Sequence, residues 1–257
     1  MASSPSLADL PLPSPFGLAS HALFLDVDGT LIDIAPHPDA VEVPVGLVDV
    51  LGRLSDALDG ALALVSGRPL ARLDAFFAPL QLPGAGIHGG ELRLEAGGPV
   101  LSQAAPMPEP LRQGLRELAG HFPGVFVEDK GTAVAIHYRA IPQAGAALGQ
   151  AIAEQVAAAG PGFTVLPGHM VFEVKPAGHD KGTAVTRFLQ LPTFAGRRPV
   201  FVGDDVTDEA GFQAARAYGG AAVSVGRALD GVDAVVKDAG AVRAWLAALL
   251  PPPGAGR

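Results

Sequence analysis

Cysteine is absent from this chain of 257 residues, which also has only one tryptophan and two tyrosines. Without cysteine there is no disulfide bond, no zinc–thiolate site and no cysteine nucleophile. Basic residues are also few, because 18 lysines and arginines stand against 26 aspartates and glutamates, giving a net charge of −8. Since a phosphate backbone requires clustered positive charge, we expect no nucleic acid partner.

Long apolar runs are absent as well. No stretch approaches the roughly 18 apolar residues that span a membrane, and no basic segment followed by an apolar one marks a signal peptide. Residues 1–19, which contain four prolines, are predicted to be a poorly ordered lead-in. A composition of 49 % hydrophobic and 17 % charged residues is typical of a globular protein. We therefore expect a cytoplasmic monomer without a membrane partner.

An apolar stretch that ends in two aspartates begins the core. Residues 21–25 precede Asp26-Val27-Asp28-Gly29-Thr30, which predicts a buried strand that ends at a turn. Residues two apart in an extended chain point the same way, so the carboxylates of Asp26 and Asp28 can converge at the carboxyl end of the strand. Two such charges require a positive partner, and a divalent cation with a phosphate supplies one. Alone, the motif also fits an ordinary Asp-Gly turn.

A second acidic strand end lies far downstream. Residues 199–203 repeat the pattern of apolar strand and glycine, and Asp204, Asp205, Asp208 and Glu209 follow. A helix dipole accounts for the last two, which open a predicted helix, but it does not account for Asp204 and Asp205. A third strand, over residues 60–65, ends at Ser66-Gly67-Arg68 before another helix, an arrangement that suits a bound phosphate.

Strands and helices alternate along most of the chain, which predicts a parallel α/β sheet. The pattern changes between about residues 106 and 174. There, a helix, strand-like residues, a helix and strand-like residues follow one another over 111–121, 125–138, 143–159 and 164–175. The sequence therefore predicts a core from residues 20–105 and 176–257, with a small α+β domain inserted over residues 106–175.

The two acidic strand ends resemble motifs one and four of the haloacid dehalogenase superfamily of phosphoryl-transfer enzymes. Ser66 then resembles the second motif, and Lys181, near the start of a predicted helix, resembles the lysine of the third motif, a point charge for phosphate. The superfamily implies a Rossmann-like, parallel-sheet haloacid dehalogenase core, here with an inserted, smaller α+β cap domain.

Further segments are similar to bacterial trehalose-6-phosphate phosphatases, over about residues 20–246. They are Ile87-His88-Gly89-Gly90-Glu91, Glu128-Asp129-Lys130-Gly131, Ala135-Ile136-His137-Tyr138-Arg139 and Val171-Phe172-Glu173-Val174-Lys175-Pro176. Gly90 departs from the family, which has alanine there. The resemblance implies hydrolysis of trehalose 6-phosphate to trehalose and inorganic phosphate, the final step of trehalose biosynthesis.

The resemblance also implies roles for the core residues. Asp26 would form a phospho-aspartate, and Asp28 would act as general acid and base. The phosphate would be bound by Ser66, Lys181 and main-chain amides near Gly29 and Thr30. Mg²⁺ would be held by Asp26, Asp204 and the carbonyl of Asp28, while Asp205 and Asp208 orient water or the motif-three lysine. Manganese or cobalt would also suit these oxygen ligands.

The sugar is expected to be bound by the inserted domain. Lys130, Glu173 and Lys175 would hydrogen-bond the distal sugar, and the last two lie on one face of a strand because they are two residues apart. Further candidates for substrate binding are Gly67, Arg68, His88 and Arg139, together with His137.

Other interpretations remain open. A phosphatase acting on sucrose phosphate, a glycerate-linked sugar phosphate or a hexose phosphate would keep the core residues and alter the cap, whereas Glu173-Val174-Lys175-Pro176 favours trehalose. A phosphorylated signalling receiver also clusters acids and a lysine, but it is shorter and is phosphorylated on a later strand. A catalytically dead binding protein would be expected to lack Asp26 or Asp28, and both are present.

Overall fold

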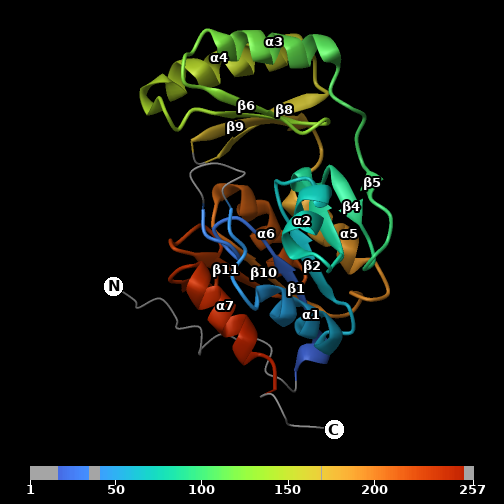
Figure 1. The fold of residues 1–257 in the computed structure, drawn as a ribbon. Helices are drawn as coiled ribbons and strands as arrows, with labels where there is room; N and C mark the ends of the chain where they lie inside the picture. Colours follow the sequence, from blue (N-terminus) through green and yellow to red (C-terminus); the bar gives the residue numbers. More distant parts are fainter. Residues whose placement is uncertain (1–16, 35–40, 169, 252–257) are drawn as a thin grey trace. The chain divides into compact units, whose positions relative to one another are not determined.

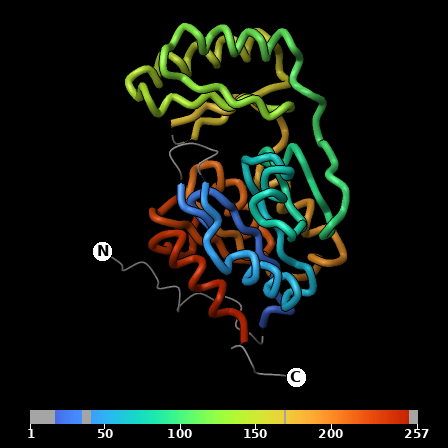
Figure 2. The backbone as a smooth tube through the Cα atoms, viewed as in Figure 1, coloured from blue at the N-terminus to red at the C-terminus, as the bar shows by residue number. Residues whose placement is uncertain are grey.

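The computed structural model describes residues 17–34, 41–168 and 170–251, and the chain divides into two compact units. The first combines Met1–Leu101 with Asp180–Arg257, and the second is Ser102–His179. The second is thus one insertion in the first, drawn in green and yellow in Figure 2. Most of the predicted lead-in lies outside the described residues. Within it, the turn Leu18–Ser20 is described, and Leu18 is buried.

The first unit is built on an eight-stranded sheet in the order β12, β11, β10, β1, β2, β3, β4, β5 (Figure 1). These strands are β1 His21–Leu25, β2 Leu62–Val65, β3 Gly84–Gly86, β4 Glu91–Arg93, β5 Leu101–Ser102, β10 Arg198–Gly203, β11 Ala221–Val225 and β12 Ala234–Val236. From β12 to β3 every pair is parallel, and β4 runs antiparallel to β3. Strands that are covered on both faces have continuous apolar sequences, as β1, β2 and β10 have here.

Strand β1 lies where the order of the sheet reverses. It pairs with β2 on one side and with β10 on the other, so that Leu23 is in register with both Leu62 and Val200. The chain after β1 therefore leaves the sheet between two neighbouring strand ends. In open α/β sheets this is the position where ligand crevices form.

Helices cover both faces of this sheet. They are α1 Leu47–Ala57, α2 Leu70–Phe77, α5 Lys181–Leu189, α6 Glu209–Ala217 and α7 Ala239–Ala248. Helix α1 contacts α7, and α5 contacts α6. In Figure 1 the first pair lies in front of the sheet and the second behind it. Phe24 of β1 is fully buried, with its ring centroid 5.6 Å from that of Phe194 and 6.0 Å from that of Phe188 in α5.

The second unit is a four-stranded antiparallel sheet, in the order β6, β7, β9, β8, with two helices on one face (Figure 1). Its elements are α3 Glu109–Gly120, β6 Phe126–Asp129, β7 Val134–His137, α4 Gly145–Ala158, β8 Phe163–Gly168 and β9 Val171–Pro176. Val134, Ile136 and Val174 pack with both helices in one apolar cluster. Because side chains alternate along a strand, Glu173 and Lys175 point to the opposite face, called here the open face.

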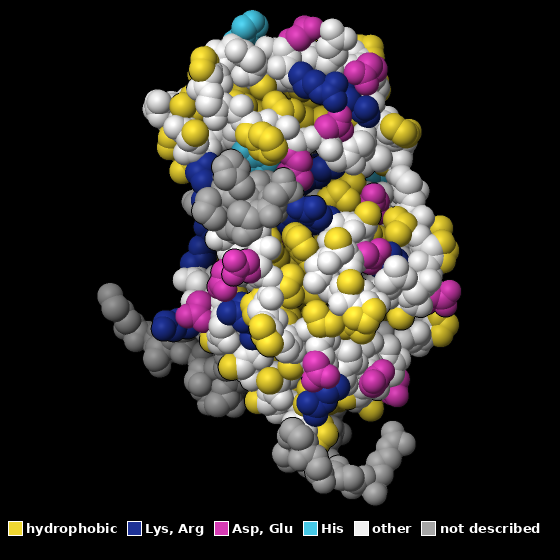
Figure 3. Space-filling model, in the orientation of Figure 1, with side chains coloured by type: hydrophobic (Ala, Val, Ile, Leu, Met, Phe, Trp, Pro, Cys, Tyr) yellow, Lys and Arg dark blue, Asp and Glu magenta, His cyan; other side chains and the backbone are white. Residues whose placement is uncertain are grey.

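These two units confirm the predicted fold class, a parallel-dominated α/β core with an inserted α+β unit. Among the described residues, no helix has the length and apolar character needed to cross a bilayer. On the face seen in Figure 3, Lys and Arg side chains are spread among Asp and Glu side chains on both units.

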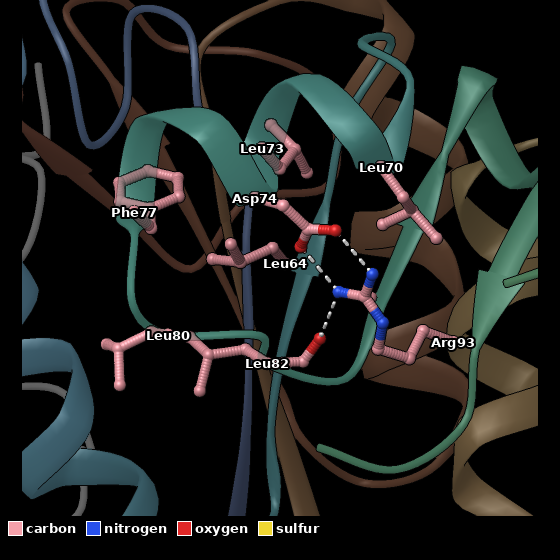
Figure 4. Close-up of a pocket in the computed structure, with 9 residues that line it drawn as sticks. Leu64, Leu70, Leu73, Asp74, Phe77, Leu80, Leu82 and Arg93 are labelled. Carbon is pink, nitrogen blue, oxygen red and sulfur yellow. Dashed lines mark hydrogen bonds and ion pairs between the residues drawn. The ribbon is translucent and has the colours of Figure 1, made fainter. Parts of the chain in front are cut away.

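A buried ion pair joins α2 to β4 in the first unit. The Arg93 guanidinium donates to both carboxylate oxygens of Asp74, at 2.7 and 2.6 Å, and also to the Leu82 carbonyl at 3.4 Å. Figure 4 shows the guanidinium directed at Asp74 among leucine side chains. Only 4 % of the Arg93 side chain is exposed, against 23 % of Asp74. The pair therefore lies largely outside the reach of solvent screening.

We expect Arg93→Met to lower the free energy of unfolding by about 2 kcal/mol, because it leaves the partly exposed Asp74 carboxylate without its counter-charge. Urea unfolding measures this. Lys237→Ala is the control, since Lys237 forms an ion pair with Asp238 on an exposed surface, where such pairs contribute little. Equal unfolding midpoints for the two variants would contradict the prediction.

Candidate functional site

Three neighbouring strand ends bring the core residues together. Asp26 follows β1, Ser66 follows β2 and Asp204 follows β10, and these strands are adjacent in the sheet. The Asp26 amide donates to the Val202 carbonyl at 2.9 Å, which prolongs the pairing of β1 with β10. This pairing places Asp26 beside the acidic loop that contains Asp204.

Lys181 lies between two carboxylates at the centre of the site. Its Nζ donates to Asp26 Oδ1 at 2.7 Å and to Asp208 Oδ1 at 2.6 Å. Ligand atoms of Asp26, Asp204 and Asp208 all lie within 4.8 Å of one another. Lys181, Asp26 and Asp208 are buried, and Asp204 is partly exposed. The structure thus gathers four of the residues that the sequence singled out.

Two glycines permit this close approach. A Cβ on Gly29 would lie 2.2 Å from Asp204 Oδ2, and Gly29 has a φ of +80°, which other residues rarely adopt. A Cβ on Gly203 would lie 2.3 Å from Asp208 Cγ. Asp208 Oδ2 in turn accepts hydrogen bonds from the amides of Asp204 and Asp205, at 3.1 and 3.0 Å. The acidic loop is therefore folded around the Asp208 carboxylate.

The site carries more negative than positive charge, and this excess shifts the pKa values of its side chains. Burial, followed by the charge of Asp208, raises the pKa of Asp26 well above its usual range, although Lys181 opposes the shift. Burial and Asp208 also raise the pKa of Asp204 to about 7. Burial alone would lower the pKa of Lys181, but Asp208 and Asp26 outweigh it and raise that pKa.

A divalent cation fits this donor set. The three clustered ligands are all carboxylates, and hard cations prefer such oxygen donors. The cation would also balance the charge that Lys181 leaves uncompensated, and so lower the pKa values of the aspartates beside it. Asp26, Asp204 and Asp208 are therefore the residues that would hold it, which adds Asp208 to the predicted ligands Asp26 and Asp204.

Other predicted core residues have different partners. The Asp28 carboxylate accepts from Arg68, and Asp205 Oδ1 accepts from Arg227 at 2.6 Å. The Thr30 hydroxyl donates to Asp26 Oδ2 at 3.3 Å. The Gly29 amide donates to the Ile32 carbonyl at 2.8 Å. This amide is therefore already hydrogen-bonded within the turn after β1.

The Ser66-Gly67-Arg68 turn is supported by His88. The His88 amide donates to the Ser66 carbonyl at 3.0 Å, and a Cβ on Gly67 would lie 2.6 Å from His88 Nε2. Ser66 Oγ accepts from the Arg68 amide at 3.1 Å. His88 is buried and has a φ of +51°. The imidazole thus packs on the glycine, which makes Gly67 a close-packing position.

The open face of the second unit carries a buried ion pair. Lys130 Nζ donates to Glu173 Oε2 at 3.0 Å, and each side chain is 8 % exposed. The Lys175 ammonium donates to the His179 carbonyl. Arg139 is exposed in the turn after β7. The structure therefore joins Lys130 to Glu173, and their contact with a sugar stays a prediction.

Two more side chains lie on the open face that were not selected from the sequence. Glu128 Oε2 lies 3.1 Å from His137 Nε2. Burial raises the pKa of Glu128, but this hydrogen bond and the charges of Lys130 and His137 together outweigh burial and lower that pKa. The Phe126 ring, 47 % exposed, has its centroid 5.7 Å from that of His137. Phe126 and Glu128 are on β6, four and two residues before Lys130. Strand alternation therefore contained the signal for them.

A family model described as trehalose-phosphatase matches residues 24–233, which include both acidic strand ends and the whole insertion. The chain belongs to the trehalose-phosphatase family. This membership confirms the narrower resemblance seen in the sequence.

Relatives of this trehalose-phosphatase family member are similar over most of their length. A probable trehalose-phosphate phosphatase of Sinorhizobium fredii is 43 % identical over 234 residues, which cover 90 % of this chain and 88 % of the relative. The trehalose-6-phosphate phosphatase of Escherichia coli is 41 % identical over 212 residues, covering 81 % and 78 %. The solved C-terminal domain of Candida albicans trehalose-6-phosphate phosphatase has a TM-score of 0.78 at 24 % identity, covering 90 % and 92 %. At 24 % identity, this similarity supports the fold alone.

For the metal-free trehalose-phosphatase, we expect the free energy of unfolding to fall as pH rises from about 4 to about 7. The pKa of Asp204 is raised from 3.8 to about 7 in the folded protein, so the folded state binds that proton more tightly than the unfolded state does. Stability is then lost as the pH approaches the folded pKa. Urea titrations in a chelator measure the slope, which Asp204→Asn should reduce.

Asp49→Asn is the control for that experiment, because the Asp49 side chain is 73 % exposed. Added Mg²⁺ should raise the melting temperature more at neutral than at acid pH, since the cation competes with protons for the carboxylates. An unchanged pH slope in Asp204→Asn would contradict the assignment.

Proposed function

We propose that this protein hydrolyses trehalose 6-phosphate to trehalose and inorganic phosphate, with Mg²⁺ as the cation, in the final step of trehalose biosynthesis. The observation that carries the proposal is the Asp26 carboxylate, held 2.7 Å from Lys181 Nζ inside a three-carboxylate cluster. Family membership and the name of the Escherichia coli relative support the substrate. We take the enzyme to be a cytoplasmic monomer. We also expect no nucleic acid partner, which the net charge of −8 supports.

In the first step, an Asp26 oxygen attacks phosphorus in line with the departing sugar oxygen. The bond from phosphorus to that oxygen breaks, Asp28 gives it a proton, and trehalose leaves. In the second step, Asp28 takes a proton from water, which attacks the phospho-aspartate on Asp26 and releases inorganic phosphate. A cation held by Asp26, Asp204 and Asp208 would neutralise charge and so keep the Asp26 carboxylate ionised despite its burial.

The remaining core residues bind and orient the phosphate. Lys181 is a fixed positive charge, positioned by Asp208, that stabilises the charge developing on the transferred group. Ser66, at the end of β2, offers a hydroxyl near the amino terminus of α2. Because Lys181 and Asp26 are buried, their charges attract each other more strongly than they would in water.

We propose that the second unit, Ser102–His179, determines which sugar is accepted. Lys130 can donate to a sugar hydroxyl, and Glu173 can accept from one, and their mutual ion pair holds both side chains in place. A site built for hydroxyls rejects a ligand that lacks them, because its own polar groups are then left unpaired. Glu128 with His137 provides a second pair of this kind on the same face.

We expect phosphate release in the presence of Mg²⁺ to be fastest from trehalose 6-phosphate, when sucrose 6-phosphate and glucose 6-phosphate are assayed in parallel. Asp26→Asn should lower kcat at least about 10³-fold, since it removes the nucleophile. The order of the three esters tests the sugar assignment, and the variant tests the chemistry. Faster hydrolysis of another ester would contradict the proposed substrate and indicate a related sugar phosphatase instead.

Lys130→Met should lower kcat/KM for trehalose 6-phosphate by about 10- to 100-fold, the effect of leaving a buried hydrogen-bonding group unpaired. It should leave p-nitrophenyl phosphate hydrolysis unchanged, because that ester has no sugar. Arg116→Ala is the control, since Arg116 lies on α3 and pairs with Asp129 on the helix side of the sheet. Equal losses on both esters would count against a sugar-reading role for Lys130.

A further inference from the structure

We propose that Arg68 is the residue that positions Asp28 for proton transfer. The sequence had grouped Arg68 with the residues that contact substrate. The inference rests on the proposed function, because it concerns the carboxylate that serves both of its steps. It assigns Arg68 a role that acts through Asp28 and not through the sugar.

The contact between the two residues is bidentate. Arg68 Nε donates to Asp28 Oδ2 at 2.6 Å, and Nη2 donates to Oδ1 at 2.7 Å. Two parallel hydrogen bonds between a guanidinium and a carboxylate fix the plane and the direction of both groups, which a single contact does not. The Asp28 side chain is 35 % exposed, so without this contact it has solvent-facing rotamers available.

Arg68 is itself held in place from three directions. Its amide donates to Ser66 Oγ at 3.1 Å, and its carbonyl accepts from the Ile87 amide at 3.1 Å. Its guanidinium carbon lies 4.9 Å from the ring centroid of Phe76, a residue of α2. Stacking on that ring restricts the plane of the guanidinium. The orientation of Asp28 is thereby linked to the end of β2 and to α2.

This link matters because Asp28 must reach two different oxygens. It protonates the sugar oxygen in the first step and deprotonates water in the second, and both lie on the line of attack at phosphorus. A small misplacement of a catalytic group can cost about 10²-fold in rate. Each Asp28 oxygen has a lone pair beyond the one that Arg68 occupies, so the contact can orient the carboxylate while leaving it accessible.

A direct sugar contact and a positioning role predict different kinetics. With Arg68→Gln, we expect kcat to fall about 10- to 100-fold for both trehalose 6-phosphate and p-nitrophenyl phosphate, with KM unchanged or lowered. The water step is common to the two esters, so phospho-aspartate should accumulate in acid-quenched samples. Arg68→Lys keeps the charge without the bidentate geometry, and it should recover only part of the loss.

Phe76→Leu should shift kcat in the same direction by a smaller factor, because it removes the ring that restricts the guanidinium. Arg72→Gln is the matched control. Its guanidinium carbon lies 5.3 Å from the centroid of the same ring, and we expect nearly wild-type kcat. Added methylguanidine should partly restore kcat in Arg68→Ala, which a purely structural residue would not show.

A raised KM for trehalose 6-phosphate alone, with unchanged turnover of p-nitrophenyl phosphate, would overturn the inference in favour of direct sugar binding. Unchanged kcat on both esters would overturn it as well. A crystal structure of Arg68→Gln gives a readout that does not require turnover, and we expect the Asp28 carboxylate in another rotamer. An Asp28 that keeps its orientation there would refute the positioning role. A wild-type protein that hydrolyses neither ester would instead refute the proposed function.

Discussion

The buried contact of one ammonium group with two carboxylates organises the first unit. Lys181 is the second residue after the insertion ends, and it opens α5. Its bonds to Asp26 and Asp208 connect the returning chain to the end of β1 and to the loop after β10. Removing the ammonium would leave two buried carboxylates facing each other, which is far more costly than losing an exposed pair. The same three residues thus close the core and form the centre of the site.

The sheet order explains how an insertion as large as Ser102–His179 is accommodated. The strands that carry the acidic ends, β1 and β10, are neighbours although the insertion separates them in the sequence. Their pairing depends on backbone hydrogen bonds and on aromatic packing around Phe24, neither of which involves the inserted residues. The inserted unit has its own apolar cluster. Its open face can therefore vary in sequence without disturbing the phosphate-binding core.

The local sequence pattern was sufficient to predict the strands and helices, but it did not predict the long-range contacts between side chains. The strand His21–Leu25 has the predicted bounds, because an apolar run before Asp-Gly specifies it locally. The stretch over residues 125–138, predicted to be strand-like, holds two strands, β6 and β7. Arg68 and Asp28 are separated by 40 residues, and only the folded sheet brings them together. Asp205 points to Arg227 because the chain turns into a 3-10 helix at Val206–Asp208, where strand alternation no longer applies.

The charge imbalance at this site has two consequences that oppose each other. Burial beside Asp208 raises the pKa of Asp26 and favours its protonated form, which cannot attack phosphorus. The same burial excludes water, so any positive charge that enters interacts more strongly with these carboxylates than it would in solution. Lys181 supplies one such charge, but it is shared between Asp26 and Asp208. With three carboxylates and one ammonium, this cluster is two positive charges short. It is therefore matched to a divalent cation from solution, which would both stabilise the fold and keep the Asp26 carboxylate ionised.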